Sequence, residues 1–247
     1  MAGFSSAELL TAWERCATLS PVGRAVALVG LANPDSPQNL ISAMPIGSRD
    51  REVLKLRVSM FGSELTGLVT CAGCGGTVEL TIDADELIAS QPPLDGEKER
   101  ELVLDCPSYQ LRFRVPRSDD LLALAAAPVG TNAEHFLLAR CLLWAEHDGS
   151  PLAASQLPAD VREMIEERMS EQDPLADIQL AGDCPDCGNA WAAPFDVPGF
   201  VWSELADFAS WLLREVHVLA SGYGWPESDI LALSPIRRRS YLDLISG

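Results

Sequence analysis

The chain has 247 residues, 47% of them hydrophobic, so it can bury a substantial core as one large domain or two small ones. Its formal net charge of −18 would repel a phosphate backbone, which argues against nucleic acid as a partner. No apolar run reaches the roughly 20 residues that span a bilayer, and the start lacks a secretion signal. We therefore expect a soluble, cytoplasmic protein without a membrane segment.

The negative charge is unevenly placed along the chain. Most of the acidic excess falls between residues 63 and 197, whereas the two ends are nearly neutral. An acidic region of this kind usually serves solvation and solubility. A docking surface for a basic partner is the functional alternative.

Three helices are predicted before the first strand. Ser5 and Glu8 form a capping box ahead of an apolar helical repeat. Pro21 is placed to begin a second helix. A third helix is expected from Ser48, as its N-cap, to Gly62, where glycine stops it.

Residues 63–90 contain the first of two C-x-x-C motifs, Cys71 and Cys74, in the stretch TCAGCGGTVEL. Strand-like sequence flanks this motif on both sides, which predicts a hairpin with the cysteines at its tip. Gly75 follows directly and permits the positive φ that turns backbone amides toward thiolate sulfurs.

Residues 91–176 are expected to be an insert between the two motifs. The polar stretch SQPPLDGEKER, residues 90–100, predicts an exposed loop. Residues 101–116 alternate as a β-hairpin, and Cys106 at its turn is predicted to be structural rather than a metal ligand. The alternation places Leu111, Phe113 and Val115 on one, apolar face and Arg112 and Arg114 on the other, basic face.

Two helices are expected in the rest of the insert. The first covers residues 131–147, with Thr131 and Glu134 as a capping box. The second covers residues 158–172 and has an acidic outer face.

Residues 177–198 contain the second motif, Cys184 and Cys187, in the stretch CPDCGNAW. Strand-like sequence flanks this motif too, so a second hairpin is predicted, and Gly188 stands where Gly75 stands in the first motif. A long helix follows over residues 199–224. Its apolar stripe is predicted to face the core, with a partner interface as the alternative: Val201, Leu205, Phe208, Leu212, Val216 and Leu219.

The remaining stretch predicts two short helices, the second with Ser234 as N-cap and Pro235 at its first position. The candidate partner-binding residues lie here and on the long helix, and they are Trp202, Trp211, Arg237, Arg238 and Arg239. A solvated face is the alternative for the arginines. Their functional interpretation is contact with an acidic partner or with the acidic middle of this chain.

The two motifs together supply four sulfurs for one structural Zn²⁺ per chain, with Cys71, Cys74, Cys184 and Cys187 as ligands. Iron bound as in rubredoxin would accept the same ligands. A dithiol redox pair, unrelated knuckles and disulfides compete with a metal site. A redox C-x-x-C usually opens a helix, whereas both motifs lie between strands. Because the insert is long, removing the metal should loosen the whole tertiary structure.

No active site is predicted from the sequence. The histidines His135, His147 and His217 form no H-E-x-x-H motif, and there is no G-x-S-x-G, P-loop or dinucleotide fingerprint. Four cysteine ligands also leave zinc no open position for a substrate. We therefore expect a protein that is not an enzyme.

These patterns predict an α+β fold, mostly helical, in which the two β-hairpin zinc knuckles form one split zinc-ribbon-like site. A single composite domain is expected over residues 1–247. Its parts are N-terminal helices (1–62), zinc knuckles (63–90 and 177–198), an inserted hairpin with helices (91–176) and C-terminal helices (199–247).

The sequence resembles the T4-type bacteriophage baseplate protein family, whose members are encoded with contractile phage tails and related bacterial contractile injection systems. The resemblance covers nearly the whole chain, from AELLTAWERC onward, and includes both C-x-x-C motifs. It is most specific in the stretches REVHVLA and WPESDILALSPIRRRSYLD. Ala72 stands where the family pattern has proline, which loosens the turn and leaves the four ligands in place.

The resemblance implies a non-enzymatic role in building the baseplate of a contractile injection system, with baseplate or hub subunits as partners. It places the protein in the bacterial cytoplasm or in an assembled phage-tail-like particle. An assembly chaperone that is absent from the mature particle is the alternative. A zinc-ribbon nucleic-acid-binding protein and a dithiol oxidoreductase are less favoured, the first because basic residues are few.

Overall fold

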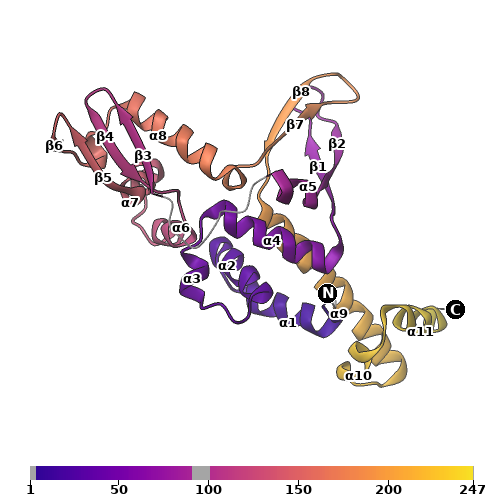
Figure 1. Cartoon of the computed structure of the whole chain (residues 1–247). Coiled ribbons are helices and arrows are strands. Elements are labelled where there is room, and N and C mark those ends of the chain that lie inside the picture. Colours follow the sequence, from indigo (N-terminus) through magenta and orange to yellow (C-terminus); the bar gives the residue numbers. More distant parts are fainter. Residues whose placement is uncertain (1–3, 91–100, 247) are drawn as a thin grey trace.

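The computed structural model describes residues 4–90 and 101–246. The chain forms a helical body from which three parts project: a pair of hairpins, an insert of sheet and helices at one end, and the C-terminal helices at the other (Figure 1). The structure mixes helices with small antiparallel sheets, which confirms the α+β class. The loop predicted over residues 90–100 lies, apart from Ser90, outside the described residues.

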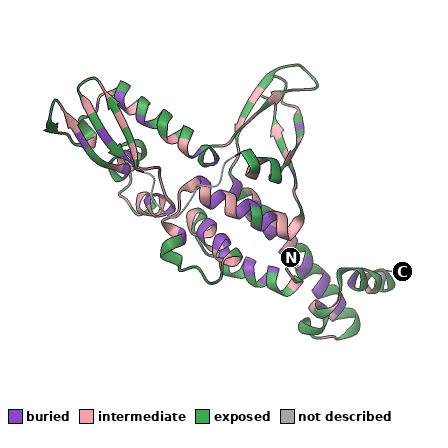
Figure 2. Ribbon diagram, viewed as in Figure 1, coloured by how far each residue is buried: buried purple, intermediate pink, exposed green. Residues whose placement is uncertain are grey.

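The helical body consists of α1 (Ser6–Ala17), α2 (Pro21–Ala32), α3 (Gln38–Ser42), α4 (Ile46–Phe61) and the first part of α9 (Val197–Tyr223). The predicted capping box is confirmed, because the Glu8 amide donates to Ser5 Oγ and the Ser5 amide donates to the Glu8 carboxylate. Pro21 begins α2 as predicted. The helices enclose the largest core, which includes Leu9, Val26, Leu28, Val53, Leu54, Val201 and Leu205. Figure 2 shows buried residues concentrated along these helices.

The predicted start of the third helix is wrong. Helix α4 begins at Ile46, behind Pro45, and not behind Ser48. Pro45 offers no side-chain cap. Instead the amide of Gly47 donates to Oδ2 of Asp173 at 2.9 Å, and Asp173 lies 126 residues further along the chain. A cap supplied by a distant residue leaves no local signal. The predicted end is confirmed, since Gly62 closes the helix with φ of 90°.

Two separate hairpins rise from the body. The first pairs β1 (Glu64–Thr70) with β2 (Thr77–Asp83) and leads into α5 (Ala84–Ser90); the second pairs β7 (Gln179–Asp183) with β8 (Ala190–Pro194). The base of the first hairpin is anchored in the main core by Leu65 and Ala84, which are buried. Both hairpins therefore form where the sequence predicts them.

The insert folds around its own sheet. Strands β3 (Leu102–Cys106), β4 (Tyr109–Phe113), β5 (Leu142–His147) and β6 (Ser150–Pro151) pair antiparallel in that order. Helices α6 (Ser118–Ala125), α7 (Ala133–Cys141) and α8 (Ala159–Gln172) accompany them, with short 3-10 turns at Ala154–Gln156 and Pro174–Ala176. The insert's core consists of Leu111, Phe113, Leu138, Ala145, Leu157, Val161 and Ile165. The predicted hairpin over 101–116 and helix over 158–172 are confirmed.

The helix predicted over residues 131–147 is only half right. It ends at Cys141, and the Leu142–His147 segment becomes strand β5 because it pairs with β4 along its whole length. The cap also differs. Asn132 Oδ1 accepts the amide of His135 at 2.9 Å, while the Thr131 hydroxyl is engaged in a bond to the carbonyl of Pro128.

Helix α9 continues beyond the body and is followed by α10 (Glu227–Ala232) and α11 (Pro235–Ser246). The predicted stripe does face the core: all its members are buried except Phe208, which is partly buried. Ser234 Oγ accepts the amide of Arg237 at 3.3 Å, as expected of an N-cap. Among the described helices, none combines the length and apolar content that crossing a bilayer requires.

Candidate metal centre

The four cysteines of the two C-x-x-C motifs meet at the hairpin tips. Their Sγ atoms all lie within 4.8 Å of one another, and within the described residues no other comparable group of metal-ligating side chains forms. The Sγ atoms of Cys71 and Cys187 are 3.7 Å apart, as are those of Cys74 and Cys184. The chain thus brings together every metal ligand predicted from the sequence.

These separations distinguish a metal centre from disulfides. A tetrahedron with metal–sulfur bonds of about 2.3 Å has edges of about 3.8 Å, close to the observed distances. A disulfide would require sulfurs about 2.05 Å apart. All seven cysteines lie in the described residues and none is in a disulfide. The cluster therefore has the geometry of a four-sulfur metal site.

Each hairpin tip holds its cysteines with the same backbone bonds. In the first, the Cys71 amide donates to the carbonyl of Gly76 and the Gly75 amide donates back to the carbonyl of Cys71, both at 2.8 Å. In the second, Cys184 takes the same place and both bonds measure 2.9 Å. Gly75 and Gly188 have φ of 73° and 71°, as the sequence predicts.

The two tips approach each other where glycine leaves room. A Cβ at Gly73 would lie 2.9 Å from Cβ of Asn189, and one at Gly76 would lie 3.1 Å from Asp186. Real Cβ atoms rarely come this close, so larger residues would push the tips apart. The glycines on the first tip therefore help to bring the two cysteine pairs within range of one ion.

The four thiols are electrostatically unequal. Backbone N–H groups of Cys74 and Gly73 lower the pKa of the Cys71 thiol to about 7. At Cys187 the amide of Asn189 favours the thiolate, but the neighbouring sulfurs outweigh it and raise the pKa to about 12. A bound cation would stabilise the thiolate form of the cysteines, so metal binding would release protons from the thiols.

Trp191 is a site residue that the sequence analysis missed. It packs against the small cluster of Cys71, Val78 and Cys184, and it faces Gly182, its neighbour across the β7–β8 pair. A tryptophan in a strand otherwise built of small residues was the available signal. The indole is partly buried there, and its Nε1 has no hydrogen-bond partner.

The predicted partner-binding residues do not form one surface. Arg237 and Arg239 are exposed on α11, but Arg238 is completely buried, so its assignment to a partner surface is corrected. Its guanidinium bonds to Glu215 at 3.0 Å and to the carbonyl of Leu233 at 2.9 Å, because this face of α11 packs on α9.

The two tryptophans also differ in exposure. Trp211 is 42% exposed on α9. Trp202 is half-buried and lies beneath the guanidinium of Arg24, 4.6 Å from the ring centroid.

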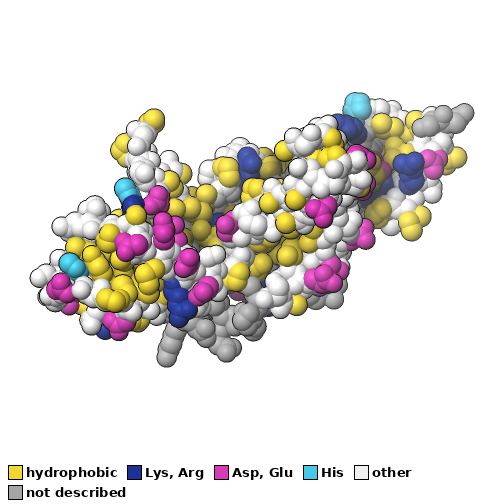
Figure 3. Space-filling view, turned by 90° about the horizontal axis from the view of Figure 1, so that it is seen from above, with side chains coloured by type: hydrophobic (Ala, Val, Ile, Leu, Met, Phe, Trp, Pro, Cys, Tyr) yellow, Lys and Arg dark blue, Asp and Glu magenta, His cyan; other side chains and the backbone are white. Residues whose placement is uncertain are grey.

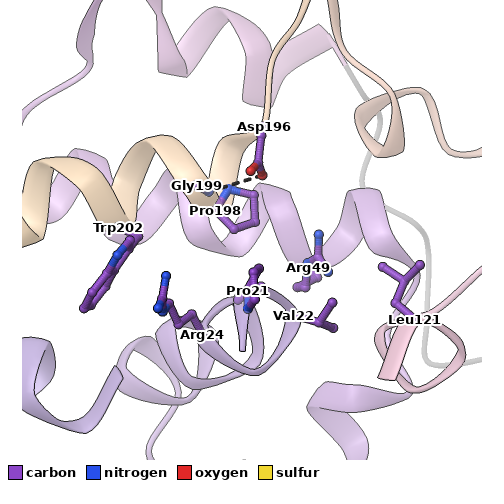
Figure 4. A pocket seen from close by; sticks show the side chains of 10 residues that line it. Pro21, Val22, Arg24, Arg49, Leu121, Asp196, Pro198, Gly199 and Trp202 are labelled. Atoms are coloured by element: carbon purple, nitrogen blue, oxygen red, sulfur yellow. Dashed lines mark hydrogen bonds between the residues drawn. The ribbon is translucent and has the colours of Figure 1, made fainter. Parts of the chain in front are cut away.

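A pocket of about 170 Å³ lies between the first turns of α2 and α9 (Figure 4). Its charged side chains are already engaged within the chain. Arg24 stacks on Trp202, Arg49 bonds Asp50 at 2.6 Å, and Asp196 caps α9 by accepting an amide of its first turn. We therefore place no binding site there.

Comparison of the chain with protein-family models, curated proteins and solved structures found no match. The resemblance to the baseplate family therefore rests on the sequence motifs alone and stays a prediction.

Proposed function

We propose that the chain is a non-enzymatic structural or assembly protein whose two hairpins are joined by one structural Zn²⁺. The observation that carries the zinc site is the convergence of four sulfurs within 4.8 Å of one another, with two of their separations at 3.7 Å. Four protein ligands close the coordination sphere, so such an ion binds no substrate and its binding free energy becomes folding free energy.

A tetrahedral four-sulfur site accepts zinc or iron, and we propose zinc, which adds no redox chemistry to a structural site. The test is elemental analysis of protein purified from the native host without added metal. One zinc per chain supports the proposal. One iron per chain, with the visible absorption of ferric thiolate, would contradict zinc and indicate a rubredoxin-like centre.

The biological role that we propose is in the baseplate of a contractile, phage-tail-like injection system. Its support is the resemblance described above, most specific in REVHVLA (residues 214–220) and in residues 225–243. The second of these stretches forms α10 and α11, which project from the body.

An assembly chaperone for baseplate or hub subunits is the second candidate. The acidic insert favours it, because acidic side chains gather over that end of the molecule (Figure 3) and would suit a basic partner surface. Quantitative mass spectrometry of intact particles separates the two roles. A fixed ratio to the baseplate subunits indicates a structural component; absence from particles, with co-purification of unassembled subunits, indicates an assembly factor.

Two further classes are distinguished by simple tests. Salt-dependent DNA binding would indicate a zinc-ribbon nucleic-acid-binding protein. Reversible dithiol turnover would indicate an oxidoreductase. We expect neither, because the chain is strongly acidic and each C-x-x-C lies in a turn between strands.

A further inference from the structure

The sheet of the insert has one face packed against helices and one face open. Leu111 and Ala145, in the middle of the sheet, are buried and share a core with Ile165 of α8. Because side chains alternate between the two faces along a strand, their neighbours point the other way. Val103 is 58% exposed and Trp144 is 39% exposed there. Within the described chain, neither of these two residues belongs to a hydrophobic core cluster.

Two rows of side chains cross this open face from β3 over β4 to β5. The residues of each row stand directly opposite one another, so they share the face. They are Val103, Arg112 and Trp144 in the apolar row and Asp105, Gln110 and Glu146 in the acidic row. The rows are two positions apart along each strand, which corresponds to about 7 Å. We call these two rows the insert face.

The one charge of the apolar row is already satisfied within the chain. The Arg112 guanidinium lies over the Trp144 ring, 5.7 Å from its centroid, and 3.4 Å from the Glu101 carboxylate. Arg112 stands between Val103 and Trp144 in the row, so its aliphatic stem adds to the apolar surface that they expose. This row therefore presents a mainly apolar surface to a partner.

The acidic row, by contrast, has no counter-charge of its own. In the part of the chain that the structure describes, neither Asp105 nor Glu146 has an ion-pair partner. Their strands flank β4 and lie about 10 Å apart, with the uncharged Gln110 between them. A cation placed above Gln110 is within reach of both carboxylates. The acidic row is therefore suited to receive one positive charge from outside the chain.

The two rows together select a basic segment with an apolar anchor. An apolar side chain would cover Val103 and Trp144, and a lysine or arginine two positions along an extended segment would meet the acidic row. Nucleic acids and anionic membranes would instead bring negative charge toward the carboxylates. A second copy of this chain would bring the same acidic insert and would also be repelled.

We propose that the insert face binds a basic segment of a partner protein, with an apolar side chain over Val103 and Trp144 and a cation between Asp105 and Glu146. The proposal rests on the protein-binding role proposed above, and it specifies the surface and the chemistry of the partner. The face is small, so it binds a single segment weakly and forms one part of a larger contact.

An NMR titration of the full metal-bound chain with a synthetic peptide tests the proposal. The peptide acetyl-Gly-Lys-Thr-Leu-Thr-Lys-Gly-amide carries a leucine with a lysine two positions away on either side. It should shift the indole resonance of Trp144, which Trp144→Ser identifies by its loss, and binding should weaken as salt is raised. Peptides with serine for the leucine, or glutamate for both lysines, should bind at least about fivefold more weakly. An unshifted Trp144 resonance, or equal binding of the three peptides, overturns the proposal.

Two double variants of equal net charge separate the insert face from the general acidity of the insert. Asp105→Asn with Glu146→Gln removes the acidic row and should weaken binding of the peptide about fivefold. Glu163→Gln with Glu167→Gln removes two exposed carboxylates from α8, away from this face, and should leave binding unchanged. An equal loss in both double variants overturns the insert face. The proposed function would still stand in that case, because the composition of intact particles tests it independently.

Discussion

The hairpin tips and the insert are held together in opposite ways. The insert encloses an apolar core of its own, with Phe113 and Ile165 completely buried. The tips bury little besides Cys71, Val78 and Cys184, with Trp191 packed alongside. Burial of apolar surface thus accounts for the insert, whereas the tips lack a comparable core and depend on the ion that their sulfurs would bind.

The two regions are also joined to the helical body differently. The first hairpin continues into the body core through apolar residues at its base. The insert is fastened by polar groups at the start of α4: the Ile46 amide donates to the carbonyl of Pro116, Arg49 bonds Ser118, and Asp173 caps the helix at Gly47. We call this junction the α4 clasp. It is buried, so each of its groups depends on its partners.

Removing the metal should produce the largest effect and should be confined mainly to the tips. Cys71→Ser and Cys184→Ser should each lose the ion, because each substitution removes one of its four sulfur ligands. The stability lost with the ion should be large, because structural zinc in small peptides contributes on the order of 10 kcal/mol. Hydrogen exchange should then rise in both hairpins while the insert core stays protected. Cys106→Ser, outside the cluster, should retain the metal.

Full metal content in both variants, with an unchanged melting temperature, would reject the shared site. Loss of protection throughout the insert would instead support the expectation from sequence that the metal holds the entire tertiary structure.

Phe113→Ala should have the converse effect. Truncating a completely buried phenylalanine costs about 3–5 kcal/mol through lost burial and the cavity left behind. The insert should melt at lower temperature while the chain keeps one metal ion per molecule. Thermal unfolding combined with metal analysis measures both, and loss of the ion in this variant would show that the two regions are not independent.

Gly47→Ala should loosen the α4 clasp. The new methyl would collide with the Asp173 carboxylate and lie 2.9 Å from the amide of Ala176, an overpacking that costs about 1–3 kcal/mol. Gly30→Ala is the matched control, because its Cβ would meet only Ile41, at 3.7 Å. Denaturant unfolding should show the first variant destabilised and the second unchanged or stabilised by up to about 1 kcal/mol. Equal stability of the two variants would contradict the proposed tight fit at the clasp.

The smallest expected effect is a pH dependence at the α4 clasp. Burial, partly offset by Arg49, raises the pKa of Asp50 to about 6, with Asp196 and Asp173 adding to the increase. Burial also raises the pKa of Asp173, one of whose oxygens has no partner. The folded state therefore binds these protons more tightly than the unfolded state, and stability from this source rises as the pH falls from above 6 toward 4.

Denaturant unfolding at pH 7.5 and 5.5, with metal content checked at both, measures this gain. Wild type should be more stable at pH 5.5 by about 1 kcal/mol, and the gain should shrink in Asp50→Asn. An identical gain in the variant would assign the pH dependence to other groups.

The sequence predicted the metal site well because its determinants are local. Each motif contains both cysteines and the glycine that shapes the turn, so Gly75 and Gly188 adopt their conformations without help from distant residues. Only the meeting of the two tips depends on tertiary structure. The side chains that favour it, such as Asn189 against Gly73, show no pattern in the sequence.

The parts that could not be predicted depend on distant partners. Leu142–His147 has the apolar content of a helix, and only pairing with β4 makes it a strand. Asp173 caps helix α4 by accepting the amide of Gly47, 126 residues earlier. Arg238 is buried because it pairs with Glu215 of another helix. In each case a contact between residues far apart in the sequence decides the conformation, and the local sequence does not reveal that contact.

X-ray absorption at the metal edge of the protein purified from its native host is the decisive test of the four-sulfur centre. We predict one zinc per chain surrounded by four sulfurs at about 2.3 Å, with no nitrogen or oxygen ligand. A chain free of metal, with Cys71, Cys74, Cys184 and Cys187 joined in disulfides or fully reactive toward alkylating reagents, would contradict it.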